Sequence, residues 1–286
     1  MRTDLKQDEI EFYQDNGFVI LHDFLNDEEL KLWSKAVDEA VKSRGKFKLL
    51  NKDELSADEK SDLSLNNGQW QDGGDNYYDK VFIQRINLWM DNEKVRKLIT
   101  NPAIGEIAAK LANVNGIRIW HDQALIKEPW ANPTGWHLDN PKWSYNSKNT
   151  LSIWIALDDA TLSNGCMYFI PGSHKMVDES FDDKNLGGPI GQNIGDLFKI
   201  YPQLAKIKSV PAPMKAGSCS FHNGLLAHGA GANMTPSWRR AMTCGFMPDG
   251  CTFNGTQNVL PDSYFNSLKI GDTLNNEEQN PLIFSM

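Results

Sequence analysis

The chain has few cysteines and no long apolar run. Its four cysteines show no Cys-x-x-Cys spacing, which argues against a disulfide framework and against a cysteine-rich zinc site. No segment reaches the roughly 18 apolar residues that a membrane span requires, and the first residues lack the apolar stretch of a secretory signal. Because free thiols suit a reducing compartment, we expect a cytoplasmic protein.

Basic residues are also in deficit. The chain has 29 lysines and arginines against 37 acidic residues, a formal net charge of −8. A negative surface disfavours nucleic acid and anionic membranes as partners. With 286 residues, 40% of them hydrophobic, the chain can bury a core without disulfides. We therefore expect one domain over residues 1–286, a monomer or weak homodimer that binds a small molecule.

The pattern of apolar residues divides the chain into a helical and a β-rich part. Helices are predicted at 7–16, 26–43 and 93–112, and short strands at 18–21 and 81–89. The polar stretch 44–79 reads as a flexible insertion or a lid. Short apolar runs separated by Gly, Pro and Asn then predict strands at 117–127, 134–138, 150–158, 166–170, 208–210, 217–221, 225–229 and 239–248.

This organisation predicts a mainly β fold with flanking helices. Strands that are short and evenly spaced are typical of a sandwich or barrel. The N-terminal helices within 7–112 would brace a β core at 117–248, and 250–286 would form a C-terminal tail. Five of the nine tryptophans lie between residues 120 and 154, where packing in the core is the default interpretation.

One His-x-Asp pair stands out within the β region. His137 and Asp139 would point to the same face of a strand and could hold one metal ion. An exposed polar strand edge would explain the pair equally well. His228, in a second apolar run, completes a set of two histidines and one carboxylate, the ligand set of non-haem Fe(II) oxygenases. Such a set leaves coordination positions open, whereas a structural zinc site is closed.

An arginine pair follows the second histidine. Arg239 and Arg240 lie just beyond His228, and neighbouring strand residues face opposite ways, so one of the two should point inward. A buried guanidinium binds a carboxylate through two parallel hydrogen bonds. Near an oxygenase iron, the distal carboxylate of 2-oxoglutarate would be such a partner, although most arginines simply lie on the surface.

Four segments of the chain resemble the phytanoyl-CoA dioxygenase (PhyH) family of Fe(II)/2-oxoglutarate-dependent oxygenases. They are residues 12–19, the His-Leu-Asp of 137–139, the run 154–175 with its Asn-Gly-Cys and Pro-Gly-Ser-His motifs, and residues 225–239. The resemblance implies a double-stranded β-helix, that is, a cupin-like jelly roll. It also implies Fe(II) as metal cofactor, with 2-oxoglutarate and O2 as cosubstrates.

The resemblance assigns roles to individual positions. His137, Asp139 and His228 match the iron ligands, and Arg239 matches the arginine that pairs with the cosubstrate carboxylate. Further matches to cosubstrate-contacting positions are Trp154, Gln123 and Gln84, the last near a lysine of the family. The chain departs from the family at Ala230, where relatives often have a serine.

Residues around the His-x-Asp strand are candidates for substrate contact, because this loop usually faces the substrate in the family. They are Trp136, Asn140, Lys142, Trp143 and Tyr145, for which simple loop packing is an equal alternative. His121, His174 and His222 are interpreted as packed or structural groups.

The resemblance implies hydroxylation of an aliphatic C–H bond, with release of succinate and CO2. Desaturation or ring formation are other outcomes within the family, whereas retention of Asp139 argues against halogenation. Two other classes stay open: a non-oxidative metal-dependent enzyme on a cupin-like barrel, and a binding protein of the same fold. The acidic balance weighs against a CoA thioester, which carries several phosphates, and favours a small metabolite.

Overall fold

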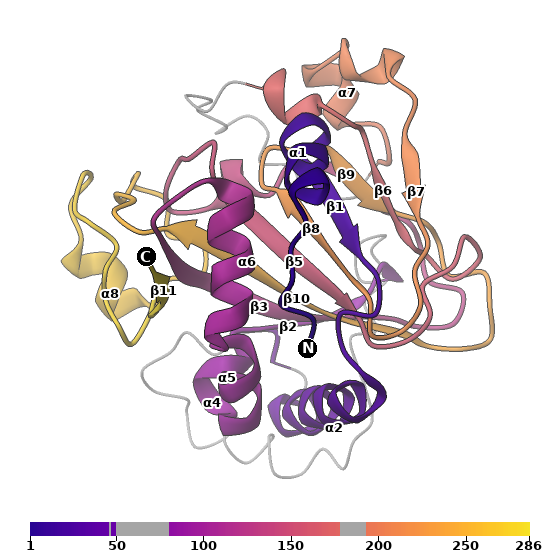
Figure 1. Cartoon of the computed structure of the whole chain (residues 1–286), viewed down its shortest axis with the longest axis horizontal. Coiled ribbons are helices and arrows are strands. Elements are labelled where there is room, and N and C mark those ends of the chain that lie inside the picture. Colours follow the sequence, from indigo (N-terminus) through magenta and orange to yellow (C-terminus); the bar gives the residue numbers. More distant parts are fainter. Residues whose placement is uncertain (46, 50–79, 178–192) are drawn as a thin grey trace.

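Two antiparallel β-sheets form the centre of the computed structural model, which describes residues 1–45, 47–49, 80–177 and 193–286 (Figure 1). The larger sheet has seven strands, in the order β1 (Phe18–Leu21), β8 (Cys219–Asn223), β5 (Leu151–Ala156), β10 (Arg239–Pro248), β3 (Gly116–Lys127) and β11 (Leu282–Ser285), with β2 (Ile83–Ile86) also paired to β3. The smaller sheet has four, in the order β4 (Thr134–His137), β9 (His228–Ala230), β6 (Met167–Phe169) and β7 (Val210–Ala212).

Helices from the N-terminal part cover one face of the larger sheet (Figure 1). They are α1 (Gln7–Asn16), α2 (Asp27–Arg44), α4 (Leu88–Asp91), α5 (Glu93–Ile99) and α6 (Pro102–Ala112). The side chains of Asn26, Asn92 and Asn101 accept backbone N–H groups at the starts of α2, α5 and α6. Such caps satisfy N–H groups that the first helical turn leaves unpaired. Later in the chain lie α7 (Leu197–Ile200), α8 (Asp262–Ser267) and the 3-10 helices η2 (Asn140–Lys142), η3 (Ser173–Lys175) and η4 (Leu204–Lys206).

Strand β5 shows how the larger sheet separates the core into two layers. Leu151, Ile153 and Ile155 pack into the cluster that includes the N-terminal helices, whereas Trp154 and Ala156 pack against residues of the smaller sheet. Alternate residues of a strand point to opposite faces, so the even-numbered side chains of β5 face the space between the sheets. The functional side chains described below lie in that space.

The predicted mainly β fold with flanking helices is confirmed. The predicted strands between 117 and 248 correspond to β3 through β10, with ends shifted by a few residues. The predicted strand at 81–89 is shorter: Asn87 adopts a left-handed φ of 56°, and α4 begins directly after it. The insertion predicted at 44–79 lies almost wholly outside the described residues, and the tail contains α8 and β11.

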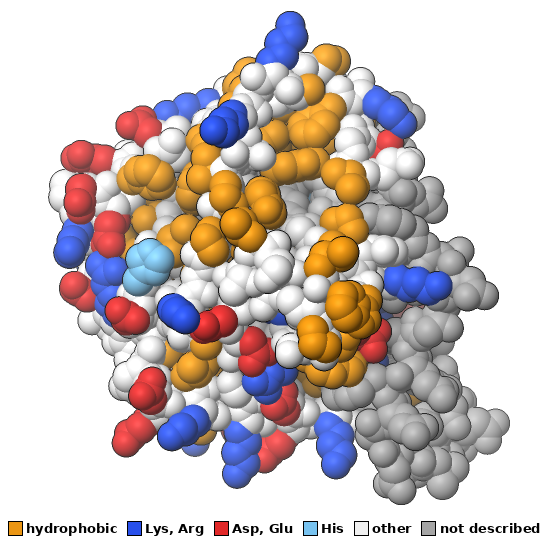
Figure 2. All heavy atoms as spheres, turned by 90° about the vertical axis from the view of Figure 1, so that its right-hand side faces the viewer, with side chains coloured by type: hydrophobic (Ala, Val, Ile, Leu, Met, Phe, Trp, Pro, Cys, Tyr) orange, Lys and Arg blue, Asp and Glu red, His pale blue; other side chains and the backbone are white. Residues whose placement is uncertain are grey.

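On the face shown in Figure 2, basic side chains stand singly among acidic and apolar ones. The described part of this face therefore presents no continuous basic surface. Among the helices of the described residues, none has the length and apolar character needed to cross a membrane.

Candidate metal centre

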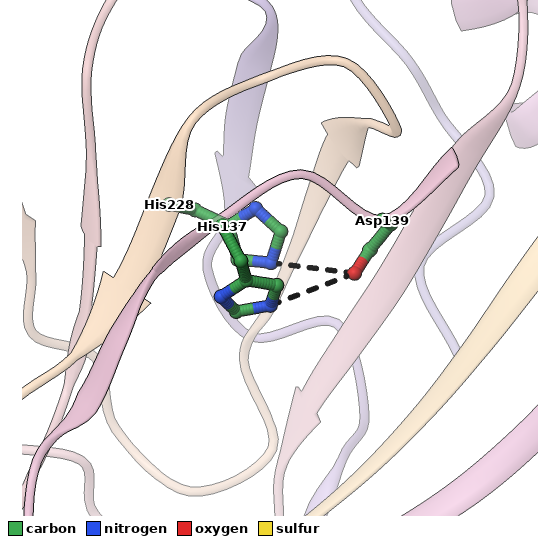
Figure 3. A group of neighbouring side chains, drawn as sticks. All are labelled: His137, Asp139 and His228. Carbon is green, nitrogen blue, oxygen red and sulfur yellow. Dashed lines mark ion pairs between the residues drawn. The ribbon is translucent and has the colours of Figure 1, made fainter. Parts of the chain in front are cut away.

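The smaller sheet brings two histidines and one aspartate together. β4 ends on His137, Asp139 follows two residues later, and β9 begins with His228. The two histidines are register partners, with ring centroids 4.1 Å apart. Figure 3 shows both rings directed at Asp139, with each Nε2 atom 3.6 Å from Oδ1. The three potential ligand atoms lie within 4.8 Å of one another, so one metal ion could contact all three.

Backbone carbonyls fix the orientation of both rings. His137 Nδ1 lies 2.9 Å from the carbonyl oxygen of Gly135, and His228 Nδ1 lies 2.9 Å from that of Leu226. A carbonyl oxygen only accepts, so each Nδ1 carries the proton and each Nε2 keeps its lone pair for the shared space. Metal-binding histidines use their second nitrogen in this way.

The protonation states also suit a metal. Burial, together with the neighbouring His137, lowers the pKa of His228 to about 3, and burial also lowers the pKa of His137. Burial would raise the pKa of Asp139, but the surrounding His228, His222 and His137 outweigh it and hold this pKa below its usual range. At neutral pH the cluster therefore offers two neutral imidazoles and a carboxylate, the forms that bind metal ions.

The cluster opens into a cavity of about 230 Å³ between the two sheets. Alternation along β3 directs His121, Gln123 and Leu125 into it. β10 contributes Arg239 and Thr243, and β5 contributes Trp154. Thus all four residues that were predicted to contact the cosubstrate share one cavity with the three candidate metal ligands. They are Arg239, Trp154, Gln123 and Gln84.

Arg239 is a buried cation with unused hydrogen-bond donors. Its side chain is only 2% exposed, and neither Nε nor Nη1 has a hydrogen-bond partner among the residues that the structure describes. Its guanidinium carbon lies 5.3 Å from the ring centroid of Trp154. Burial lowers the pKa of Arg239 to about 10, so the group stays charged at neutral pH. A buried charge without a counter-ion is costly, and the paired N–H groups of a guanidinium fit a carboxylate.

The neighbouring Arg240 faces the other way. It forms ion pairs of 2.7 Å with both Asp158 and Asp38. Of the two arginines, the inward-facing one is therefore Arg239. Strand alternation predicted that one of the two faces inward, and the resemblance to the PhyH family pointed to Arg239.

Two glutamines lie side by side on neighbouring strands of the cavity wall. Gln84 on β2 donates a hydrogen bond from Nε2 to Gln123 Oε1 on β3. Gln84 pairs with Leu125, and Ile86 pairs with Gln123 in the strand register. Ala230 also lines the cavity, and its methyl group offers no hydroxyl.

The candidates for substrate contact divide into two groups. Lys142 and Trp143 line the cavity, whereas Trp136, Asn140 and Tyr145 are not part of its described lining. Trp136 packs on Phe198, with ring centroids 5.8 Å apart. The Asn140 side chain donates to the carbonyl of Tyr145, whose own hydroxyl pairs with Thr150 and with the carbonyl of Phe246. Asn140 and Tyr145 thus hold the loop that follows β4, whereas Trp136 packs β4 against α7.

Two residues of the cavity wall were interpreted from the sequence as core groups. His121 and His222 are both buried, as predicted, yet both line the cavity. His121 could have been found from its place two residues before Gln123 on one strand, since both then face the same side. His222 had no such local signal, because its position depends on the pairing of β8 with β5.

Comparison with known proteins supports the same assignment. The sequence pattern of the phytanoyl-CoA dioxygenase (PhyH) family matches residues 13–241. Phytanoyl-CoA dioxygenase domain-containing protein 1 of Bos taurus is 24% identical over 282 residues, covering 90% of this chain and 94% of that protein. The peroxisomal phytanoyl-CoA dioxygenase of Homo sapiens is 19% identical over 247 residues, covering 85% and 68%.

Solved structures show the same architecture. SnoK, a non-heme alpha ketoglutarate dependent carbocyclase from nogalamycin biosynthesis, aligns with a TM-score of 0.74 at 26% identity, covering 98% of this chain and 96% of SnoK. The epimerase SnoN, solved with Fe3+, alpha ketoglutarate and nogalamycin RO, aligns with a TM-score of 0.69 at 22% identity, covering 97% and 98%. The family match spans most of the chain, and we conclude that it belongs to the phytanoyl-CoA dioxygenase family.

Proposed function

We propose that this protein is an Fe(II)- and 2-oxoglutarate-dependent dioxygenase that hydroxylates an aliphatic C–H bond of a small-molecule metabolite. The observation that carries the proposal is the unpaired, buried guanidinium of Arg239 in the same cavity as the His137, Asp139 and His228 cluster. When bound, the iron and 2-oxoglutarate supply the oxidising chemistry from O2, with succinate and CO2 as coproducts. The protein contributes binding and orientation.

Each proposed role follows from a property of the side chain. His137 and His228 would bind iron through Nε2 and Asp139 through a carboxylate oxygen, since their other polar atoms are engaged elsewhere. Arg239 would bind the distal carboxylate of the cosubstrate, with Trp154 packed against the guanidinium. Trp154 lies on β5, on one flank of β10. Gln123 on β3 and Gln84 on β2 lie on the other flank, and they would contact the cosubstrate from there.

We further propose that the two sheets form the double-stranded β-helix of one domain over residues 1–286. The antiparallel pairing within both sheets and the shared apolar cluster between them support this arrangement. Lys142 and Trp143 would then contact the substrate at the cavity wall.

A second oxidative outcome has a specific observation in its favour. SnoK, whose similarity spans nearly the whole chain, is described as a carbocyclase, so ring formation is the alternative to hydroxylation. A non-oxidative metal-dependent enzyme would leave the buried charge of Arg239 unexplained. A binding protein without activity would not require the intact ligand set found at His137, Asp139 and His228.

The test is an anaerobic titration of the protein with Fe(II) and 2-oxoglutarate. We expect a visible charge-transfer absorption band, then succinate release in air across a panel of small metabolites, with product masses separating hydroxylation from ring formation. His137→Ala should abolish the 2-oxoglutarate turnover, whereas the control His22→Ala changes an exposed histidine. Absence of the band in the wild type, or full turnover in His137→Ala, would contradict the proposal.

A further inference from the structure

The two oxygens of Asp139 have different surroundings. Oδ1 faces the Nε2 atoms of His137 and His228, at 3.6 Å from each. Oδ2 accepts a hydrogen bond of 3.0 Å from the hydroxyl of Ser152 and lies 3.5 Å from His222 Nε2. One oxygen is thus directed at the candidate metal position, while the other is held by the larger sheet.

His222 and Ser152 approach this second oxygen from adjacent strands. They are register partners on β8 and β5, and both face the space between the sheets. His222 is only 2% exposed, with its ring packed 5.6 Å from Phe169 and 4.6 Å from His228, centroid to centroid. The sheet therefore fixes where this imidazole points.

The environment of His222 also selects its tautomer. Its Nδ1 atom is buried and has no hydrogen-bond partner within the described part of the chain. A buried unpaired N–H costs more than placing the proton where an acceptor waits, so the proton belongs on Nε2, facing Asp139 Oδ2. Ser152 and His222 are then two donors on one carboxylate oxygen.

We propose that His222, together with Ser152, is a positioning residue that holds Asp139 so that only Oδ1 is presented to the metal. The inference rests on the proposed metal site. A carboxylate can bind a metal through one oxygen or two, and donors on Oδ2 favour the first mode. With two histidines and one oxygen bound, three positions of a six-coordinate ion stay open, one more than if both oxygens were bound.

His222 is not itself part of the ligand set. Its nitrogen faces the oxygen that points away from the other two histidines, and the cluster of convergent ligand atoms comprises only His137, Asp139 and His228 among the described residues. Its action on the metal passes through Asp139.

The experiment measures Co(II) binding to the metal-free protein by absorption, without cosubstrate or substrate. In His222→Phe, which keeps a ring but no donor, we expect Co(II) affinity to fall by about 10- to 100-fold, with altered ligand-field bands. His222→Gln retains an N–H donor and should restore part of the affinity and the band shape. Ser152→Ala should weaken binding in the same direction. His121→Phe is the matched control: His121 is also a buried histidine of the cavity, but it has no ion pair with Asp139, so affinity should stay within about twofold.

Three results would overturn the proposal. A folded His222→Phe with wild-type Co(II) affinity and bands would remove the positioning role. Loss of binding as complete as in His137→Ala would make His222 a ligand. Equal weakening in His121→Phe would indicate a general effect of the cavity.

If His222→Phe does not fold, the Co(II) affinities of His222→Gln and Ser152→Ala are compared with that of the wild type instead. Wild-type Co(II) binding without any 2-oxoglutarate turnover would reject the proposed function while leaving this inference testable.

Discussion

At the residue scale, Arg239 gives the clearest prediction about cosubstrate binding. Arg239→Leu removes the only described guanidinium that faces the cavity, and hydrogen bonds to charged groups contribute about 1.5–3 kcal/mol. We expect the KM for 2-oxoglutarate to rise by about 10- to 100-fold, measured by succinate release. Even Arg239→Lys should weaken binding, because an ammonium cannot form the two parallel bonds of a guanidinium.

The adjacent arginine supplies the control for this experiment. Arg240 pairs with Asp158 and Asp38 on the other face of β10, away from the cavity. Arg240→Leu should leave the KM for 2-oxoglutarate nearly unchanged, although the protein can lose some stability. An equal rise of KM in both variants would show that the arginines act through the fold and not through the cosubstrate.

A second residue-scale prediction concerns acid stability of the metal-free protein. Burial lowers the pKa of His121 to about 4 from 6.5. Between these values the unfolded chain binds a proton that the folded chain does not, so stability falls as pH drops through this window. His121→Phe should reduce the slope of unfolding free energy against pH by about 1 kcal/mol per unit between pH 6 and 4.5, because the two states differ there by slightly less than one bound proton.

Urea unfolding at a series of pH values measures this slope. His137 and His228 also have lowered pKa values. The unfolding free energy of the variant should therefore still fall as the pH drops, but less steeply than that of the wild type. Asp139 acts in a lower window, because its pKa is itself lowered and its stabilising charge is lost only in stronger acid. Parallel slopes in wild type and His121→Phe would contradict the assignment of His121 as a buried neutral group.

At the element scale, the close contact between α6 and β11 predicts whether a substitution in α6 raises or lowers the stability of the protein. Ala is normally better than Gly inside a helix by about 1 kcal/mol. At Gly105, however, a Cβ atom would lie 2.8 Å from Phe284 Cβ and 3.0 Å from Ile283 Cγ1. We therefore expect Gly105→Ala to destabilise the protein by about 1–3 kcal/mol, measured by urea unfolding. An increase in stability would mean that β11 can move away from α6 at little cost.

Elements were predictable from the sequence where local pattern decided them. The strands from β3 to β10 were found because Gly, Pro and Asn separate their apolar runs. β11 was not predicted: its few apolar residues lie in a polar tail, and it forms a strand because the edge of β3 offers it backbone partners. The break after β2 was also missed, since it depends on Asp122, whose carboxylate accepts the N–H groups of Leu88 and Trp89.

Within the candidate site, too, local sequence patterns indicated some residues, whereas contacts that depend on the pairing of distant strands could not be predicted. The spacing of His137 and Asp139 implies a shared face of one strand, whereas His228 and Arg239 were assigned from the motifs that resemble the PhyH family. The contact of His222 with Asp139 could not be predicted in this way, because it depends on the pairing of β8 with β5. Pairing between distant segments is not encoded in local periodicity.

At the scale of the whole molecule, the charge distribution limits the substrate. The net charge is −8, and on the face in Figure 2 the basic side chains are scattered among acidic, apolar and other side chains. Within the described cavity lining, the cations besides Arg239 are Lys48 and Lys142. A substrate with several phosphates would need more positive charge than this to offset its own. The composition and the cavity thus both favour a compact metabolite over a CoA thioester.

The site also links the two sheets, which gives a prediction for the entire fold. Iron would join β4 and β9, and 2-oxoglutarate would join them to Arg239 on β10. A ligand that binds only the folded state at 100 times its Kd stabilises it by about 2.7 kcal/mol. For a chain of this size we expect Fe(II) with 2-oxoglutarate, under anaerobic conditions, to raise Tm by about 5–10 °C.

Variants of the site should show how much of this increase in Tm comes from Fe(II) and how much from 2-oxoglutarate. In Arg239→Leu, Fe(II) alone should still raise Tm, while 2-oxoglutarate should add little, because the metal ligands are intact and the carboxylate partner is gone. In Asp139→Ala neither addition should raise Tm, since the cosubstrate would bind in part through the metal. A full shift in Asp139→Ala would show that the metal binds elsewhere. A shift from 2-oxoglutarate alone, absent only in Arg239→Leu, would show that the guanidinium anchors the cosubstrate before any metal is present.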